Sequence, residues 1–336
     1  MKKRIFLAAD IGGTKTHVGI FRPGHKRPRS IVIRTYPSAQ WPSLESILRD
    51  FLSDYSYRPE ASCLAIAGPV LGGRAKTTNL PWVVSEARIR RAFGWKRVKL
   101  VNDLAGTAMS IPLLRPAELY LLNTGIKQKT GAIGLVAPGT GLGQAILIKP
   151  NSHHFVIPSE GGHCDFAPAD EDQLHLWHFL YNNYGHVSIE RLLSGPGMLN
   201  IYMWLKESRR YREPQWLERT LAAADTANIA GIITEAALKR RTPICRATLK
   251  NFTVILGSVC ANLALTAMAT GGIYLGGGIP PKILPFLKEP DFLKAFTNKG
   301  RFAELLGKIP IKVILNEKAP LLGAARVAFS LIEPKS

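Results

Sequence analysis

Cysteine is scarce in this sequence of 336 residues. Four occur, at Cys63, Cys164, Cys245 and Cys260, and no two of them have the C-x-x-C spacing. This scarcity argues against a disulfide-stabilised secreted scaffold and against a structural zinc site built on paired cysteines. We therefore expect free thiols in a reducing compartment, which is the cytoplasm.

Acidic residues are the second shortage. The chain has 24 Asp and Glu against 44 Lys and Arg, a formal net charge of +20. A surplus of this sign attracts anions such as nucleotides, nucleic acids or anionic lipids. However, the basic segments "RPGHKRPRS" (22–30) and "RIRRAFGWKRVK" (88–99) are also typical of solvated turns and helix faces. No helix-turn-helix, zinc-finger or RNA-recognition pattern accompanies them, so we predict no nucleic-acid partner.

Long uninterrupted apolar runs are also missing. The opening "MKKRIFLAADIGG" has a short apolar run before Asp10, which predicts a first β-strand and not a signal peptide. No charged residue occurs from Asn251 to Pro281, yet Ser258, Asn262 and several glycines interrupt that stretch. It predicts a buried helix followed by a buried strand, because a membrane span needs ~20 mostly apolar residues. We therefore predict no membrane partner.

The length of the chain predicts two lobes, because single cores stop growing at roughly 250–300 residues. Strands are predicted at 4–10, 16–21, 30–36, 61–70 and 98–103, and helices at 43–55 and 85–94. Ser43 and Gly94 are the expected helix caps. We predict a small α/β lobe of residues 1–110, completed by about 312–336, and a large α/β lobe of residues 111–311.

Three glycine-rich loops follow apolar strands: "DIGGTKT" (10–16), "PGTGLG" (138–143) and "GGGIPP" (276–281). Glycine lets backbone N–H groups approach phosphate oxygens without an intervening Cβ. None of the loops matches the P-loop or the dinucleotide-binding fingerprint. One such loop is more often a tight turn than a phosphate site, but three in this order favour nucleotide binding. The first strand, loop and strand also resemble residues 131–148, which suggests an internal duplication.

An amide and a carboxylate end one predicted strand, in "KLVNDLAGTA" (99–108). Asp103 can serve either as a proton acceptor or as the N-cap of a helix that starts at Leu104. The residue types alone leave both roles open.

The order of five motifs resembles that of bacterial glucokinases. They are DIGGT, VND, APGTGLG, SEGGH and GGGI, and the resemblance runs from about Phe6 to Phe329. "PSEGGHCDFAP" and "SIERLLSGPGMLNIY" are its most specific parts. The family belongs to the hexokinase, actin and Hsp70 superfamily. The resemblance therefore implies a two-lobed, ribonuclease H-like α/β ATPase fold with an interlobe cleft.

Two features bear on the subfamily. Lys15 stands where many glucokinases have Asn, and Lys is common there in the related repressor–kinase (ROK) sugar kinases. The cysteine-rich zinc motif of ROK proteins is absent from the sequence, which favours glucokinase.

The resemblance implies a role for each motif. Asp10 would face Mg²⁺ through water. The implied nucleotide-binding residues are Asp10, Gly12, Gly13, Thr14, Gly139, Thr140, Gly276, Gly277 and Gly278. The implied sugar-binding residues are Asn102, Asp103, Glu160, His163, Glu190 and Gly141, with Asp103 as the catalytic base. The chemistry agrees, since phosphoryl transfer needs a proton acceptor and a sugar needs several fixed hydrogen-bonding groups.

Each polar residue also has a purely structural alternative. Asn102 and Asp10 can be turn residues, and Glu160 can cap or pair on the surface. His163 can be a structural histidine, and Glu190 can pair with the adjacent Arg191.

The predicted function is ATP-dependent phosphorylation of the 6-hydroxyl of D-glucose, with ATP and Mg²⁺, by a cytoplasmic homodimer. The nearest alternative is a kinase for mannose, fructose or an N-acetylated hexose. A sugar-responsive DNA-binding regulator is disfavoured, because the first phosphate motif begins at Asp10 and leaves no N-terminal DNA-binding domain. A sugar-binding protein without catalysis is a third alternative, but Asp10 and Asp103 are both present.

Overall fold

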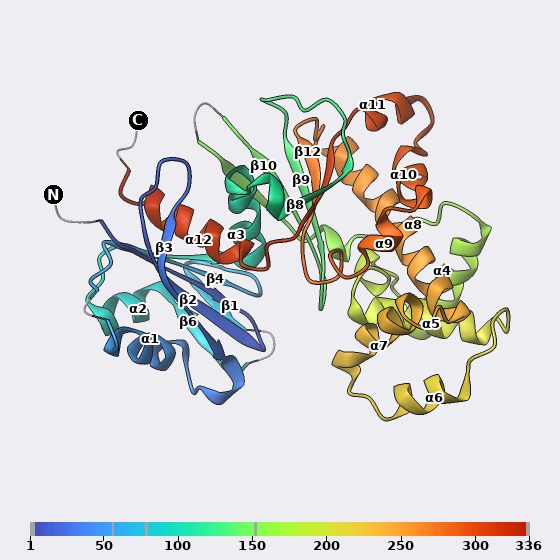
Figure 1. Ribbon diagram of the computed structural model, residues 1–336, viewed down its shortest axis with the longest axis horizontal. Coiled ribbons are helices and arrows are strands. Elements are labelled where there is room, and N and C mark those ends of the chain that lie inside the picture. Colours follow the sequence, from blue (N-terminus) through green and yellow to red (C-terminus); the bar gives the residue numbers. More distant parts are fainter. Residues whose placement is uncertain (1–3, 56, 78–79, 151–152, 334–336) are drawn as a thin grey trace. The chain divides into compact units, whose positions relative to one another are not determined.

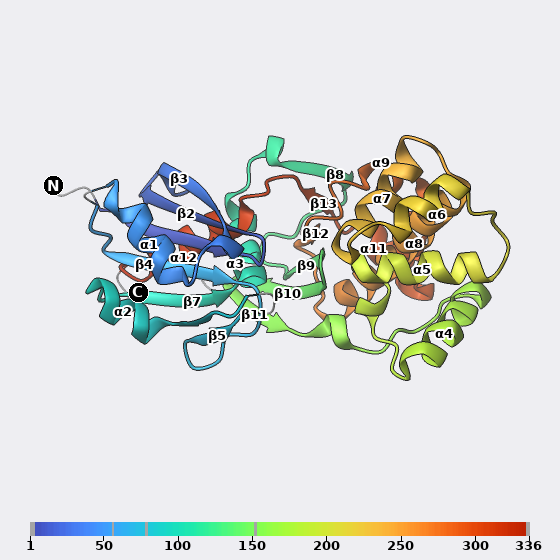
Figure 2. The same ribbon diagram turned by 90° about the horizontal axis from the view of Figure 1, so that it is seen from below.

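The chain divides into two compact units, each built around its own β-sheet (Figures 1 and 2). The structure is a computed structural model and describes residues 4–55, 57–77, 80–150 and 153–333. Unit 1 comprises residues 1–118, 154–156 and 316–336, and unit 2 comprises residues 119–153 and 157–315. The predicted lobes are 1–110 with about 312–336 and 111–311, and residues 111–118, 154–156 and 312–315 are divided differently between the two units.

Unit 1 contains a five-stranded sheet in the order β3-β2-β1-β4-β7. Its strands are β1 (Phe6–Ile11), β2 (Lys15–Arg22), β3 (Arg29–Pro37), β4 (Ala61–Ile66) and β7 (Val98–Asn102). The first three strands form an antiparallel meander, and β4 and β7 add in parallel to β1. The short β5 (Arg74–Lys76) and β6 (Val83–Ser85) pair as a separate hairpin.

Helices cover both faces of this sheet because the residues of its strands alternate between the two faces. Leu7, Ala9 and Ile11 of β1 share a core with α1 (Leu44–Ser53) and α2 (Glu86–Phe93). Phe6 and Ala8 face α12 (Ala319–Ser330) on the opposite side. Helix α3 (Asp103–Ser110) packs against α12 (Figure 1).

The predicted caps of α1 and α2 are confirmed. Ser43 accepts a hydrogen bond from the Ser46 amide and forms a capping box at the start of α1. Helix α2 ends at Gly94, which adopts the left-handed conformation with φ of 66°.

Helices α3 and α12 approach each other closely through glycines. A Cβ added at Gly323 of α12 would overlap the carbonyl oxygen of Gly106 in α3. A Cβ added at Gly106 would lie 3.0 Å from the carbonyl oxygen of Pro320. This close approach fixes the position of α3, whose first residue is Asp103.

Unit 2 contains a six-stranded sheet in the order β11-β10-β9-β12-β13-β8. The strands are β8 (Leu119–Asn123), β9 (Ile133–Pro138), β10 (Leu142–Ile148), β11 (Phe155–Ser159), β12 (Gly272–Leu275) and β13 (Ile311–Ile314). Strands β9 and β10 form an antiparallel hairpin, while β12 and β13 add in parallel on the other side of β9. This arrangement repeats that of β1, β2, β4 and β7, so the predicted similarity of the two hairpins is confirmed in topology.

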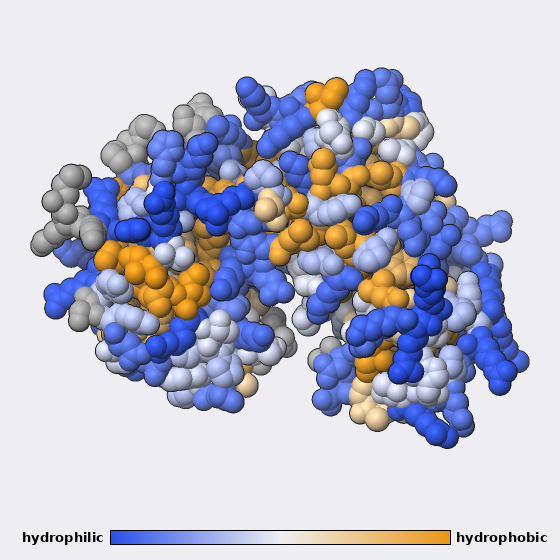
Figure 3. All heavy atoms as spheres, in the orientation of Figure 1, coloured by the Kyte–Doolittle hydropathy of each residue, from blue (hydrophilic) through white to orange (hydrophobic). Residues whose placement is uncertain are grey.

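The remaining helices pack in unit 2 around one apolar core. They are α4 (Glu171–Tyr184), α5 (Gly195–Glu207), α6 (Gln215–Ala222), α7 (Thr226–Leu238), α8 (Pro243–Thr266), α9 (Leu284–Leu287), α10 (Pro290–Thr297) and α11 (Ala303–Gly307). By length and composition alone α8 can cross a membrane, but 67% of its most apolar window is buried among these elements. With the fully buried β12 after it, α8 confirms the predicted buried helix and strand. Hydrophilic residues form much of the face drawn in Figure 3.

Candidate active site

In unit 1 the predicted residues gather where the parallel strands end. Ile11 of β1 pairs with Ile66 of β4, and Ile66 pairs with Asn102 of β7. The turn that follows β1 and the start of α3 after β7 therefore lie at the same edge of the sheet. The carboxyl edge of parallel strands is the usual place for ligands in open α/β sheets.

Two carboxylates meet at this edge. Asp10 lies on the α3-facing side of β1, and Asp103 is the first residue of α3. Burial, and then repulsion from Asp103, raises the pKa of Asp10 to about 7. Burial also raises the pKa of Asp103, and hydrogen bonds from the amides of Leu104 and Asp103 partly oppose that rise. Neither carboxylate is therefore a surface group that ionises freely.

Asn102, and not Asp103, is the N-cap of α3. Its Oδ1 accepts a 2.9 Å hydrogen bond from the Leu104 amide, and its Nδ2 donates to the Gly68 carbonyl at 3.0 Å. Asp103 Oδ1 also accepts from the Leu104 amide, at 2.8 Å. The alternative in which Asp103 caps a helix starting at Leu104 is therefore wrong, because the helix starts one residue earlier. Both side chains have local hydrogen bonds that fix their direction.

The turn of Gly12, Gly13 and Thr14 is held by a serine that the sequence analysis missed. The Ser38 hydroxyl donates to the Gly12 carbonyl at 2.8 Å, and the Ser38 amide donates to the Thr14 carbonyl at 3.0 Å. Since its own proton is used, Ser38 Oγ accepts from the Thr16 hydroxyl at 2.9 Å. Ser38 and Thr16 are fully buried. Ser38 follows the third strand of the meander, and no motif near it in the sequence marks this contact.

In unit 2 the two glycine-rich loops lie side by side. The Gly139 amide donates to the Gly141 carbonyl at 2.8 Å and closes the β9–β10 loop around Thr140. The Gly276 amide donates to the Val136 carbonyl at 2.9 Å. Gly277 has φ of 78°, and a Cβ there would overlap the Pro138 carbonyl oxygen. Only glycine fits this close approach. Beyond Gly278, the Ile279 amide donates a further hydrogen bond to the Pro138 carbonyl.

The N-terminus of α5 lies against the first of these loops. The Gly195 amide donates to the Gly139 carbonyl at 2.8 Å, and Ser194 caps the helix by accepting from the Gly197 amide at 3.0 Å. Glycine loops beside a helix N-terminus favour an anion, because amides and the positive end of the helix dipole converge there.

Three of the four predicted sugar residues of unit 2 come from two neighbouring 3₁₀ turns, and the fourth, Gly141, lies in the β9–β10 loop. Glu160 precedes η4 (Gly161–His163), and its carbonyl accepts from the His163 amide at 2.9 Å. Turn η4 packs on β10, and the Ile189 amide donates to the Cys164 carbonyl at 2.9 Å, which ties η4 to η5 (Ile189–Arg191). Glu160 and His163 are exposed, so His163 is not a buried structural histidine.

Glu190 binds the end of the β9–β10 loop, residues 139–142, which is the predicted phosphate loop. Its Oε2 accepts a 2.7 Å hydrogen bond from the Leu142 amide. Arg191 instead lies over the Tyr184 ring, 4.1 Å from its centroid. The alternative in which Glu190 forms a surface pair with Arg191 is therefore wrong. The predicted residues thus form two sets, one at the strand ends of unit 1 and one around the β9–β10 loop of unit 2.

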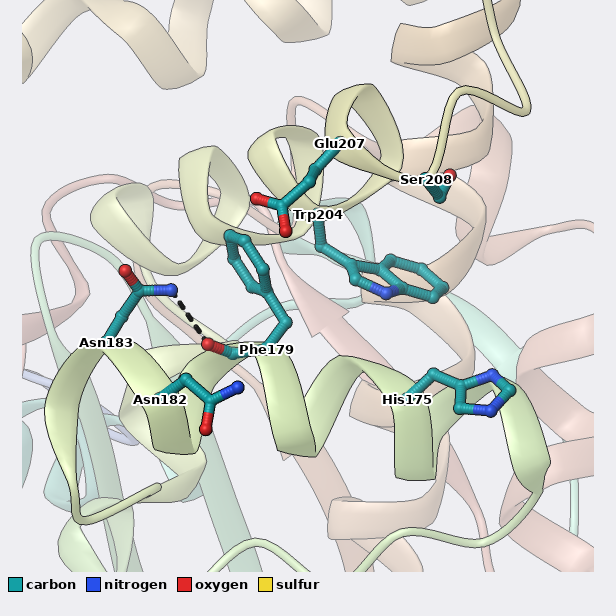
Figure 4. Close-up of a pocket in the computed structure, with 7 residues that line it drawn as sticks. All are labelled: His175, Phe179, Asn182, Asn183, Trp204, Glu207 and Ser208. Carbon is teal, nitrogen blue, oxygen red and sulfur yellow. Dashed lines mark hydrogen bonds between the residues drawn. The ribbon is translucent and has the colours of Figure 1, made fainter.

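A hollow of about 490 Å³ lies elsewhere in unit 2, between α4 and α5 (Figure 4). Its lining residues are His175, Phe179, Asn182, Asn183, Trp204, Glu207 and Ser208. None of them is a predicted site residue, and most are exposed. The hollow therefore contains none of the candidate site residues.

The described residues contain no group of three or more His, Cys, Asp and Glu side chains arranged to hold a metal ion.

Comparison with known proteins identifies the family. Residues 7–330 match the family model described as Glucokinase. A glucokinase of Nostoc punctiforme is 37% identical over 97% of this chain and 99% of the relative. A glucokinase structure from an Antarctic psychrotroph has a TM-score of 0.86 and 30% identity, covering 97% of this chain and 99% of that one. A ROK family glucokinase from Streptomyces griseus, in complex with glucose and AMPPNP, shares the fold at a TM-score of 0.64 and 19% identity, covering 97% and 99%. The chain belongs to the glucokinase family.

Proposed function

We propose that this protein transfers the γ-phosphoryl group of ATP to the 6-hydroxyl of D-glucose, giving glucose 6-phosphate and ADP. The observation that carries the proposal is the half-buried carboxylate of Asp103 at the start of α3, which lies close enough to Asp10 to raise the pKa of that carboxyl. Membership of the glucokinase family supports it.

Asp103 is the proposed general base. Efficient base catalysis needs a pKa near the working pH, and burial raises the pKa of Asp103 toward that range. The Leu104 amide bound to Oδ1 fixes the direction of the carboxylate. Asp103 would accept the proton of the 6-hydroxyl as the oxygen attacks phosphorus.

The glycine-rich turns are the proposed phosphate cradle. Gly12, Gly13 and Thr14 would contact the transferring phosphoryl group. Gly139 and Thr140 would bind the remaining phosphates, and Gly276–Gly278 would lie at the adenosine. The hydrogen bonds of Ser38 and Gly195 to these turns support this role, because they orient the backbone before ATP arrives.

Asn102, Glu160, His163, Glu190 and Gly141 are the proposed sugar-binding residues together with Asp103. A site built from fixed acceptors and donors discriminates strongly against sugars that lack a matching hydroxyl. Phosphoryl transfer also has to exclude water, which competes with the sugar as acceptor of the phosphoryl group.

Mg²⁺ fits the donor set of unit 1. Burial and the nearby Asp103 both disfavour the ionised form of the Asp10 carboxylate. A nearby cation would stabilise that ionised form. Mg²⁺ commonly keeps several waters and binds through one or two carboxylates plus substrate phosphates. Bound with ATP, it would neutralise charge on the phosphates, and Asp10 would orient its waters.

The assembly is proposed to be a homodimer, as the family resemblance implies, and the four scattered cysteines favour the cytoplasm. Sedimentation of the purified protein at several concentrations tests the dimer, and a single monomeric species would contradict it.

ADP release with a panel of sugars tests the proposed function. We expect turnover with glucose to exceed turnover with mannose, fructose and N-acetylglucosamine at equal concentrations. Preferred phosphorylation of another hexose would instead support the alternative suggested by Lys15, and ATP hydrolysis independent of any sugar would refute both.

A further inference from the structure

The carboxylate of Glu190 touches the phosphate loop directly. Its Oε2 accepts from the Leu142 amide at 2.7 Å, at the point where the loop enters β10. The Glu190 side chain is half-buried and has a second oxygen with further lone pairs for a ligand. A predicted sugar-binding residue thus accepts a hydrogen bond from the backbone of the predicted phosphate loop.

The same segment holds the other end of the loop. The Gly195 amide donates to the Gly139 carbonyl at 2.8 Å. Between these two contacts, the buried Ser194 donates its hydroxyl to the Glu190 carbonyl at 2.8 Å. Residues 190–195 therefore form a hydrogen-bonded bracket around residues 139–142.

The Glu190 carboxylate leaves no space for a side chain at Gly141. A Cβ at Gly141 would lie 2.5 Å from Glu190 Oε2, nearer than carbon and oxygen pack. A Cβ at Gly139, in the same loop, would meet its nearest atom, the Gly278 amide nitrogen, at 4.0 Å. Space beside Glu190 is therefore required at Gly141 and not at Gly139.

We propose that Glu190 is a positioning residue for the phosphate loop as well as a sugar ligand, and that sugar and nucleotide binding are coupled through Gly141 and Leu142. The sugar half of this proposal rests on the proposed function, whereas the loop half does not. A hydroxyl that donates to the Glu190 carboxylate restricts its motion, and the Leu142 amide bound to it is then restricted as well. Glucose should therefore tighten nucleotide binding, and the nucleotide should tighten glucose binding by the same factor.

Nucleotide binding without sugar is the first test. We expect Glu190→Ala to weaken ADP binding, measured by calorimetry, about tenfold, the effect of losing one hydrogen bond to a charged group. Glu207→Ala is the matched control, since Glu207 is an exposed glutamate at the end of α5 outside the predicted site, and its ADP affinity should stay within about twofold. Equal ADP affinity of Glu190→Ala and the parent protein would overturn the loop half.

Glu190→Gln separates the two roles. Its amide oxygen can still accept from Leu142, so ADP affinity should return to within about threefold of the parent. Glucose affinity should fall on the order of tenfold, because the carboxylate acceptor is lost. Equal loss of ADP affinity in the Gln and Ala variants would contradict positioning by this hydrogen bond.

The glycines provide the second test. Gly141→Ala should weaken glucose binding about tenfold by displacing the Glu190 carboxylate, whereas Gly139→Ala should change glucose affinity less than about twofold. In a Glu190→Ala background, Gly141→Ala should have no further effect on ADP affinity, because the oxygen it displaces is gone. If the losses of ADP affinity caused by Gly141→Ala and Glu190→Ala add in the double variant, the proposal is refuted. Thermal melts check that all variants are folded.

The two tests also separate this inference from the proposed function. If the parent protein fails to bind glucose, the proposed function fails, and the ADP measurements still decide whether Glu190 positions the loop. If glucose binds but does not alter ADP affinity, the coupling is refuted and the proposed function stands.

Discussion

The hydroxyl of Ser38 donates a 2.8 Å hydrogen bond to the carbonyl oxygen of Gly12. This contact joins the residue after the third strand to the turn after the first, and both partners of the Ser38 hydroxyl lie in or beside that turn. The turn of Gly12, Gly13 and Thr14, which is the proposed phosphate turn of unit 1, is thus held by a residue with no reactive role of its own.

Ser38→Ala should therefore impair both stability and nucleotide use. It leaves the buried Thr16 hydroxyl without its acceptor, which should cost about 1–3 kcal/mol in the free energy of unfolding. The KM for ATP should rise several-fold. Ser53→Ala removes a similar bond on the surface, from Ser53 to the Asp50 carbonyl, and should change neither quantity appreciably. If Ser38→Ala had the same KM for ATP as the parent protein, the turn would keep its conformation without Ser38.

Asp103→Asn tests the catalytic base. The amide keeps the shape of the side chain but has little ability to accept a proton, so kcat should fall by about 10²- to 10⁴-fold. Glucose binding, measured by calorimetry, is the control and should remain detectable. Near-normal kcat with intact glucose binding would reject Asp103 as the base.

Gly323→Ala tests the packing of α3 on α12. The added methyl would overlap the Gly106 carbonyl oxygen, so the helices must separate, and overpacking of this kind costs about 1–3 kcal/mol or more. Because α3 begins at Asp103, kcat should fall as well. Gly231→Ala is the matched control. Gly231 is an exposed residue inside α7 with open space around it, and alanine there should stabilise the protein by up to about 1 kcal/mol. Equal melting temperatures of the two variants would contradict the packing argument.

Glu118 should contribute a pH-dependent part of the stability. Burial opposes its ionisation, but hydrogen bonds from the Arg27 guanidinium at 2.7 Å and the Arg115 amide at 2.7 Å outweigh burial and lower its pKa. Because the folded pKa is the lower one, this stabilisation is fully present above the unfolded value of about 4.3 and is lost as pH falls through the folded value.

Glu118→Gln should remove that part of the pH dependence. At pH 7 we expect a loss of about 1 kcal/mol in the free energy of unfolding from urea titration, shrinking toward zero at the acid end. Glu235→Gln, which breaks the exposed pair with Lys239, should change stability much less. A loss for Glu118→Gln that is constant from pH 7 to pH 3 would contradict the ionic account.

The sequence predicted the local parts of this molecule well, because local hydrogen bonds and periodicity determine them. Ser43 and Gly94 are the caps of α1 and α2, and the strands leading to Asp10 and Asn102 end within one residue of the predicted ends. The family motifs identified the candidate residues.

The contacts that position those residues could not be predicted. Ser38 reaches Gly12 only once the meander has formed, and Gly323 meets Gly106 only when the last helix has returned to the first unit. The choice of Asn102 over Asp103 as the N-cap depends on the Gly68 carbonyl that receives the Asn102 amide. Each of these contacts joins residues far apart in the chain, and no local pattern in the sequence specifies them.

The position of α12 has a consequence for how the protein folds during synthesis. Phe6, Ala8 and Cys63 of the first sheet bury one face against α12, and residues 319–330 leave the ribosome after every strand of both sheets. Until α12 is synthesised, that apolar face of the sheet is exposed. Unit 2 can therefore fold before unit 1 has acquired its last helix. Unit 1 should therefore depend on chaperones for longer than unit 2.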